Sequence, residues 1–211
     1  MKNILEFLLK ANKLKKIARE GWIIRKIKNP ETIAGHIFIL SLMALVFAKE
    51  KKMNVNMGKV FKMILCHELP ALCLGDKSPY DYVLRTKSEK QKKEVLKTWI
   101  RFSRKEKMRI FFEEYREGKK AIKKLISNLT PYLKKEILQL WEEFKTKNSP
   151  EARFLNQIRI LANLFQALQY WQKDKKFPIQ PWWEWAFEVA DNQMTFEFLD
   201  ELKRKFRANI K

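Results

Sequence analysis

Three of the seven prolines in this 211-residue chain stand at positions where an α-helix can begin. Pro30 follows Asn29, which can cap a helix N-terminus, and Pro131 and Pro150 open two later apolar segments. Proline is accepted in the first turn of a helix because the N–H groups there have no acceptor within the helix. With only five glycines and no long alternating runs of β-branched residues, the chain is predicted to fold as an all-α protein.

The apolar residues between these starting points recur at helical intervals. We expect a single domain over residues 1–211, because a chain of this length can bury one sizeable core. Within it we expect a basic insertion at about residues 85–112 and an aromatic-rich C-terminal segment at about 177–207. The expected helices cover residues 3–18, 30–51, 56–74 with a break at Pro70, a basic helix over 85–107, helices that begin at Pro131 and Pro150, and a final helix that ends near Arg207 after a loop over 177–185.

Positive charge is the second strong feature of the sequence. Lys and Arg number 45 against 24 Asp and Glu, which gives a net charge of +21. Such a field attracts nucleic acid, nucleotides or an anionic membrane surface, although a Lys-rich solvated surface would look the same. The charge is densest in the insertion, where aromatic residues are interleaved; the alternative there is an exposed helix whose aromatics face the core. The residues expected to bind a polyanion are Lys92, Lys93, Lys97, Arg101, Arg104 and Lys105.

Cysteine usage and apolar run length bear on where the protein resides. Cys66 and Cys73 are predicted to lie two turns apart on one helix, too far apart for an unstrained disulfide. Because no export signal is visible at the N-terminus, we expect reduced, buried thiols in a cytoplasmic protein. The longest apolar stretch, Ile37–Ala48, has 12 residues and is predicted to be a core helix rather than a transmembrane segment.

Residues that could carry chemistry concentrate around two histidines, His36 and His67, the second of which is followed by Glu68. With its neighbouring segments, this pattern resembles the HD-domain 5'-deoxynucleotidases of the bacterial YfbR type and their archaeal and eukaryotic relatives. The resemblance implies an all-α HD-domain helical bundle, to which this chain adds the basic helical insertion and an extra C-terminal helix. It runs from about Leu14 to Tyr170 and rests on Leu14–Trp22, Pro30–His36, Leu129–Leu133, Leu140–Phe144 and Glu151–Phe154.

The resemblance also implies a metal site in which several ligands are replaced. In that family a His, an adjacent His–Asp pair and a distant Asp hold a divalent metal, and a Glu three residues after the pair acts on the attacking water. The metal lowers the pKa of its bound water and the free carboxylate shuttles the proton. In this chain His36 and His67 keep the histidine positions, Glu68 replaces the Asp of the pair, Ala71 replaces the acid/base Glu and Arg159 replaces the distant Asp.

These replacements limit which roles can be assigned. Alanine cannot accept a proton and a guanidinium cannot bind a metal, so no catalytic residue is assigned. If a metal site survives, its ligands are His36, His67 and Glu68. A linked hypothesis is that Arg159 supplies the charge of the metal and pairs with Glu68, and also with Asp76. The residues expected on the substrate or phosphate side are Arg19, Trp22, His36, His67, Asp76 and Arg159.

Three functions are compatible with this sequence. The favoured one is a degenerate HD-domain protein that has lost metal-dependent nucleotidase activity, needs no cofactor, and binds a polyanion such as nucleic acid, an RNA-containing assembly or a nucleotide. The second is a phosphohydrolase of (deoxy)nucleoside monophosphates that uses Mn, Co or Zn. The third is a structural subunit that contacts a larger complex through Trp182, Trp183 and Trp185. The resemblance further implies a homodimer.

Overall fold

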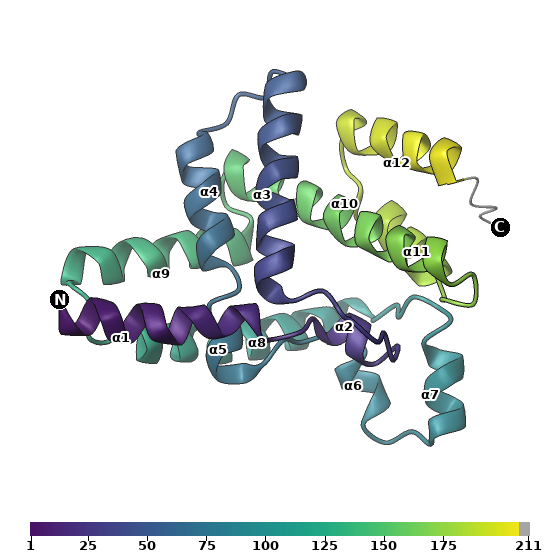
Figure 1. Ribbon diagram of the computed structural model, residues 1–211, viewed down its shortest axis with the longest axis horizontal. Helices are drawn as coiled ribbons and strands as arrows, with labels where there is room; N and C mark the ends of the chain where they lie inside the picture. The colour runs from purple at the N-terminus through teal and green to yellow at the C-terminus, as the bar shows by residue number, and fades with distance from the viewer. Residues whose placement is uncertain (207–211) are drawn as a thin grey trace.

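The computed structural model describes residues 1–206, and within that range the regular elements are all helices (Figure 1). The α-helices are α1 (Lys2–Ala11), α2 (Glu20–Ile23), α3 (Ile33–Glu50), α4 (Met57–Cys66), α5 (Ala71–Leu74), α6 (Asp81–Leu84), α7 (Glu89–Val95), α8 (Arg104–Leu125), α9 (Pro131–Thr146), α10 (Pro150–Lys173), α11 (Gln180–Val189) and α12 (Gln193–Phe206). Helix α10 is the central element: 14 of its residues are buried, and α3, α4, α9, α11 and α12 pack against it. The all-α prediction is confirmed.

The predicted starts of α9 and α10 are confirmed by their caps. The hydroxyl of Thr130 accepts the N–H of Leu133 ahead of α9, and that of Ser149 accepts the N–H of Ala152 ahead of α10. Each cap satisfies a backbone donor that has no partner inside the helix. A proline stands in the first turn of both helices, as the sequence pattern indicates.

The first two predicted helices are both too long, for one shared reason. The chain between them pairs with itself: the N–H of Arg19 donates to the carbonyl of Glu31, and the N–H of Ile33 donates to the carbonyl of Ile17. Because these groups are used in an extended pairing, α1 ends well before residue 18 and α3 starts at Ile33 instead of Pro30. The pairing fixes where α3, which carries His36, enters the core.

The tract predicted as one basic helix over 85–107 is divided into α7, a non-helical stretch over 96–103 and the first turn of α8. Two capping boxes set these boundaries. Ser88 and Gln91 exchange side-chain and backbone hydrogen bonds at the start of α7, and Ser103 and Glu106 do the same at the start of α8. The one-helix prediction is therefore wrong. In contrast, the predicted break at Pro70 is confirmed, because it separates α4 from α5.

The aromatic-rich C-terminal segment contains two helices. The predicted loop over 177–185 is wrong from Gln180 onward, because Pro181 occupies the first turn of α11 and lets the helix begin there. Helix α12 follows and reaches Phe206, the last described residue. Arg207, the predicted end of the final helix, lies outside the described residues.

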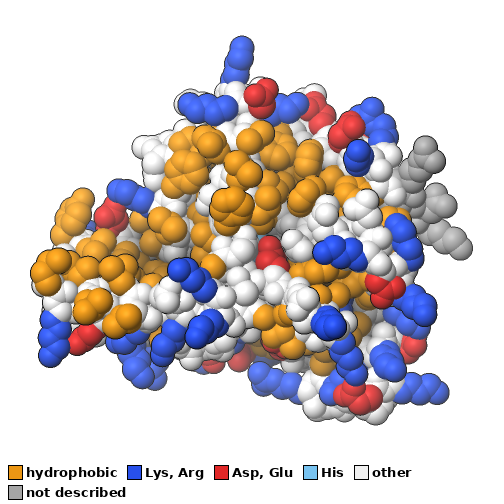
Figure 2. Space-filling model, viewed as in Figure 1, with side chains coloured by type: hydrophobic (Ala, Val, Ile, Leu, Met, Phe, Trp, Pro, Cys, Tyr) orange, Lys and Arg blue, Asp and Glu red, His pale blue; other side chains and the backbone are white. Residues whose placement is uncertain are grey.

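Helix α3 is apolar along its whole length. By length and composition alone it could cross a membrane, which corrects the expectation that its apolar run is too short. A core helix passes the same test, and α3 packs against α4 and α10. Its outward side is exposed at Phe38, Leu42, Leu45 and Val46, and Figure 2 shows apolar side chains gathered over α3 and over α1.

The two cysteines are free, but they differ in surroundings. Cys66 is buried at the end of α4, and burial raises the pKa of its thiol to about 12. Cys73 lies in α5 and is exposed, so the prediction of two buried thiols on one helix is wrong for this residue. Pro70 is the cause, since it ends the helix between them.

Gly118 of α8 provides a direct test of the packing between α8 and α9. A Cβ at this position would lie 2.5 Å from Cζ2 of Trp141, which is fully buried. We therefore expect Gly118→Ala to lower the free energy of unfolding by about 1–3 kcal/mol through overpacking, measured by urea denaturation. Gly35→Ala is the matched control, because its Cβ would make only ordinary 3.5 Å contacts and should leave stability unchanged or raised. Equal effects of the two substitutions would contradict this packing.

Candidate functional site

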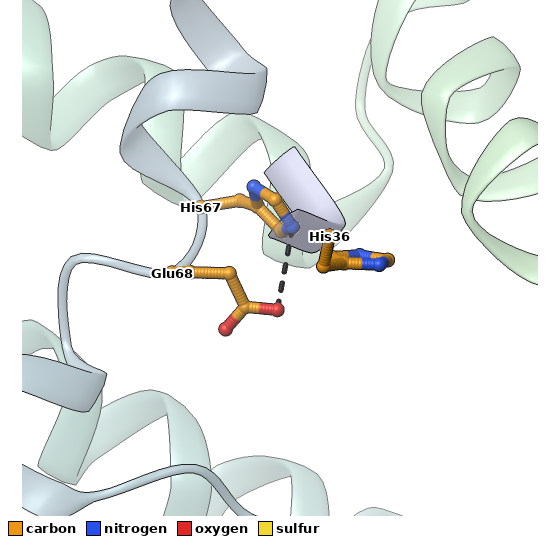
Figure 3. Close-up of side chains that lie close together, drawn as sticks. All are labelled: His36, His67 and Glu68. Carbon is orange, nitrogen blue, oxygen red and sulfur yellow. Dashed lines mark ion pairs between the residues drawn. The ribbon is translucent and has the colours of Figure 1, made fainter. Parts of the chain in front are cut away.

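Three residues that are candidates for metal binding meet where α3 passes the end of α4 (Figure 3). His36 comes from the first turn of α3, His67 directly follows α4, and Glu68 is the next residue. The ring centroids of the two histidines lie 5.9 Å apart, and the candidate ligand atoms of all three residues lie within 4.8 Å of one another. The tertiary structure thus brings His36 next to His67 and Glu68, which follow it by 31 and 32 positions in the sequence.

The two imidazoles are buried but do not use all of their nitrogens. His67 Nδ1 lies 2.7 Å from the carbonyl oxygen of Ile64, and because a carbonyl only accepts, Nδ1 carries the proton. His67 Nε2 lies 3.3 Å from Glu68 Oε1, the contact drawn as a dashed line in Figure 3, but it forms no hydrogen bond. Both ring nitrogens of His36 also have no hydrogen-bond partner among the described residues. Burial, followed by the charge of Arg19, lowers the pKa of His36 well below its usual value, so this ring is neutral at pH 7. Its free lone pair is directed toward no protein donor.

Orphaned buried nitrogens of this kind fit a divalent transition metal. Neutral imidazoles together with a carboxylate are the ligand types that such metals prefer. His67 is oriented by a backbone carbonyl on its other nitrogen, which is the usual arrangement for a metal-binding histidine. His36, His67 and Glu68 would be the ligands.

Glu68 is held by Arg19. Arg19 Nη1 donates to Glu68 Oε1 at 2.6 Å, Arg19 Nε lies 3.6 Å from Asp76 Oδ2, and Arg19 Nη2 donates to Asn163 Oδ1 at 3.4 Å. Burial alone would raise the pKa of Glu68, but the positive charge of Arg19 outweighs it and holds that pKa well below its usual range. Burial raises the pKa of Asp76 to about 6, although Arg19 and the N–H donated by Glu20 lower it in part.

The predicted pairing of Arg159 with Glu68 and Asp76 is wrong, because Arg19 occupies that place. Arg159 lies on α10 and forms no ion pair within residues 1–206. Its guanidinium carbon stands 5.7 Å from the ring centre of Trp185, and its Nε is buried without a partner. The extended pairing of residues 17–19 places Arg19 beside Glu68, and Arg159 has no described carboxylate within ion-pair distance.

A cavity of about 520 Å³ opens beside this cluster. Arg19, His67, Glu68, Asp76 and Arg159 line it, so most of the expected substrate-side residues share one space. Ala71, where the resemblance places the acid/base carboxylate, lines the same cavity with an apolar side chain. The sequence did not single out Arg25 or Lys147, which also line it, because no local pattern distinguishes them from other cations on a basic chain.

Trp22 also borders this cavity but is only 1% exposed. Its ring stacks on Trp182 at a centroid distance of 4.4 Å and meets Tyr170 edge-on at 5.0 Å, while its indole N–H donates to Glu31. With its faces covered by these neighbours, Trp22 packs the wall of the cavity instead of offering a surface on which a base could stack.

The tryptophans that were expected to contact a partner differ in their burial and in their neighbours. Trp183 is completely buried and stacks on Phe187, so it cannot make such a contact. Trp182 and Trp185 line the cavity. Trp99, from the non-helical stretch of the basic insertion, also lines the cavity and donates its indole N–H to Glu188 at 2.7 Å.

The basic residues of the insertion do not lie along one helix face. Lys92 and Lys97 pair with glutamates three residues before them, Glu89 and Glu94. Lys93, Arg101, Arg104 and Lys105 are exposed but are spread over α7, the stretch after it and the start of α8. Binding of a polyanion at this tract remains a prediction.

Comparison with known proteins identifies the family of this fold and site. Residues 11–194 match the sequence model of the family described as HD domain. The chain belongs to the HD-domain family. A Danio rerio protein named 5'-deoxynucleotidase HDDC2 is 31% identical over 176 residues, which cover 83% of this chain and 74% of that protein. A Bos taurus protein of the same name is 27% identical over 210 residues, covering 99% of this chain and 88% of its own length.

Solved structures support the same fold. A conserved hypothetical protein from Pyrococcus furiosus aligns with a TM-score of 0.67 at 20% identity, over 96% of this chain and 98% of its own. A predicted metal-dependent phosphohydrolase from Magnetospirillum magnetotacticum aligns with a TM-score of 0.59 at 20% identity, over 97% and 94%. At this level of identity the likeness concerns the fold, and the predicted HD-domain membership is confirmed.

Arg19 offers a test of the buried ion cluster. Arg19→Met would leave Glu68 and Asp76 without their shared cation, and we expect it to lower the free energy of unfolding on the order of 3 kcal/mol. Lys62→Met is the control, because it removes a cation from an exposed ion pair with Glu136, which contributes little to stability, so it should lower the free energy of unfolding much less. Urea denaturation measures both. A loss at Arg19 no larger than that at Lys62 would refute the structural role of the cluster.

Proposed function

We propose that this HD-domain protein is a divalent-metal-dependent phosphohydrolase that acts on (deoxy)nucleoside monophosphates. One observation carries the proposal: His36 is buried and neutral with both ring nitrogens unpartnered, beside the free Nε2 of His67 and the carboxylate of Glu68. Burying unpaired polar atoms is costly, so a cluster of them indicates a ligand. Relatives named 5'-deoxynucleotidase support the substrate class.

In this proposal His36, His67 and Glu68 would hold the metal, which when bound supplies an activated water and neutralises charge on the phosphate. Arg19 positions Glu68 and Asp76, since it contacts both carboxylates. Arg159 contributes a cation to the cavity that no carboxylate pairs with, and a guanidinium suits phosphate recognition. The aromatic side chains of Trp182 and Trp185 help to exclude water from one wall.

A second candidate is a nucleotide or polyanion binding protein without hydrolysis. Ala71 favours it, because the cavity has an apolar group where the resemblance places the proton-shuttling carboxylate. The replacement of a distant acidic ligand by Arg159 favours it as well. On this view the imidazoles are retained for shape, and the net charge of +21 serves binding.

Metal content separates the two candidates. We expect purified protein incubated with manganese, cobalt or zinc to retain close to one metal ion per chain by elemental analysis, and His36→Gln to lose it. Glu136→Gln, an exposed carboxylate outside the cavity, should retain the metal. Circular dichroism of each variant checks that the fold is kept. A protein that binds nucleotide but holds no metal, and releases no phosphate from deoxynucleoside monophosphates, would support the second candidate and exclude the first.

Ala71→Glu tests how much the rate of phosphate release is lowered by the absence of a carboxylate at this position. If the cluster is a working metal site, a glutamate at this cavity position can take a proton from the attacking water. We expect phosphate release to rise by roughly 10²-fold, within the range that general acid–base groups contribute. Ala71→Gln has nearly the same size and no basic carboxylate, so it should give no increase. If Ala71→Glu and Ala71→Gln have the same rate, the proposed acid/base role at this position is wrong.

A further inference from the structure

Helix α1 is attached to the body of the protein by only a few apolar side chains. Phe7 packs against the core, and so does Leu14 of the short 3₁₀-helix η1 (Asn12–Lys15) that follows α1. None of the residues of α1 is buried. The fold of residues 1–206 therefore leaves apolar side chains uncovered at this end of the chain. They are Met1, Ile4, Leu5, Leu8 and Leu9.

The uncovered apolar side chains share one face of α1. They recur at steps of three and four residues, which is the spacing of neighbours along a helix surface. Leu5 is 60% exposed, and Leu9, one turn later, is 61% exposed. Lys2, Glu6 and Lys10 recur at steps of four and form a separate polar face. Helix α1 is therefore amphipathic, and its apolar face is open to solvent.

Helix α3 adds a second exposed apolar strip. Its outward side chains recur at helical steps, and no Asp, Glu, Lys or Arg occurs from residue 33 to residue 48. Figure 2 shows the strips of α1 and α3 on the same face of the molecule, with basic side chains at the border of this face. Large exposed apolar surfaces are uncommon and mark a contact with a partner or a membrane. The strip on α3 consists of Phe38, Leu42, Leu45 and Val46.

The residues in and after α1 carry an unbalanced positive charge. Residues 1–16 contain five lysines and one acidic residue, Glu6. All five lysines are exposed, and none of them forms an ion pair with a residue in 1–206. Other exposed lysines, such as Lys51 and Lys62, do pair with glutamates. This end of the chain therefore offers its charge to a negative partner. The five are Lys2, Lys10, Lys13, Lys15 and Lys16.

Apolar surface next to unpaired lysines fits an anionic lipid bilayer. An interfacial helix buries its apolar face at the boundary between headgroups and acyl chains, and its lysines attract the charged lipids. A second copy of this chain fits less well. In a two-fold interface the same patch meets itself, so the unpaired lysines of one copy would approach those of the other.

We propose that α1 and the outward side of α3 form a docking face for an anionic membrane surface. The protein binds there peripherally: α1 lies along the interface with its leucines among the acyl chains, and the lysines of residues 1–16 lie at the lipid phosphates. Helix α3 does not cross the bilayer, because its other side stays packed against α4 and α10. The inference is independent of the proposed activity, since no residue of α1 or α3 lines the cavity.

Co-sedimentation of the full chain with lipid vesicles tests this docking face. One vesicle contains phosphatidylcholine alone, and the other contains phosphatidylcholine and phosphatidylglycerol in equal amounts. We expect binding to the anionic vesicles to be at least about tenfold tighter at low salt, and this difference to disappear near ~1 M salt, where the charges are screened.

Two double variants separate the apolar contribution from the charge. Leu5→Ser with Leu9→Ser should weaken binding to the anionic vesicles by about tenfold or more, because two leucines lose their burial in the bilayer. Lys13→Gln with Lys16→Gln should weaken it on the order of fivefold for each lysine. All four side chains are exposed, so circular dichroism should show an unchanged fold.

Met108→Ser with Phe112→Ser is the matched control. These two side chains are also exposed and one turn apart, but they lie on α8, so vesicle binding should be unchanged. Equal losses in the leucine variant and this control would mean general stickiness and overturn the inference. No binding to anionic vesicles, or equal binding to both vesicles, would overturn it too. So would a dimer in light scattering that Leu5→Ser with Leu9→Ser converts to a monomer, because the face would then belong to a second copy.

Discussion

The contacts of the Arg19 guanidinium connect three parts of the fold. This one side chain meets Glu68 after α4, Asp76 after α5 and Asn163 of α10. Buried carboxylates without a cation are strongly unfavourable, so the approach of these segments depends on Arg19 being present. Its position depends in turn on the short extended pairing between residues 17–19 and 31–33. That pairing also determines where α3 begins, and therefore where His36 meets His67.

Two kinds of cation lie near this cluster: those that form an ion pair with a carboxylate and those that do not. Arg19 is fully engaged and organises the site, whereas Arg159 and Lys147 are left without carboxylate partners in the same cavity. His36 is kept neutral by burial and by the charge of Arg19, which preserves a lone pair on its ring. A metal would use this lone pair, and phosphate groups would use the unpaired cations. His67 and Glu68 line the same cavity as these cations, and His36 lies next to them.

The sequence predicted which residues form the candidate site better than it predicted which of them contact one another. His36, His67, Glu68, Asp76 and Arg159 were all singled out, and they gather at one place. The ion-pair partner of Glu68 was misassigned because the sequence identifies both Arg19 and Arg159 as cations but does not show which of them contacts Glu68 in the folded chain. Trp22 was expected to contact substrate and Trp183 a partner protein, but both are buried, and burial is decided by which helices cover them.

Local signals, by themselves, determined the all-α class, the starts of α9 and α10, the break at Pro70 and the resemblance to the HD-domain family. These features depend on caps, prolines and spacing, which act within a few residues. Only the tertiary structure decided the ion pair between Arg19 and Glu68, the hydrogen bond from Trp99 to Glu188 and the position of Arg159 and Lys147 along one cavity. Each of these joins segments from different helices, and their energies depend on distance and burial, which exist only after those helices have packed.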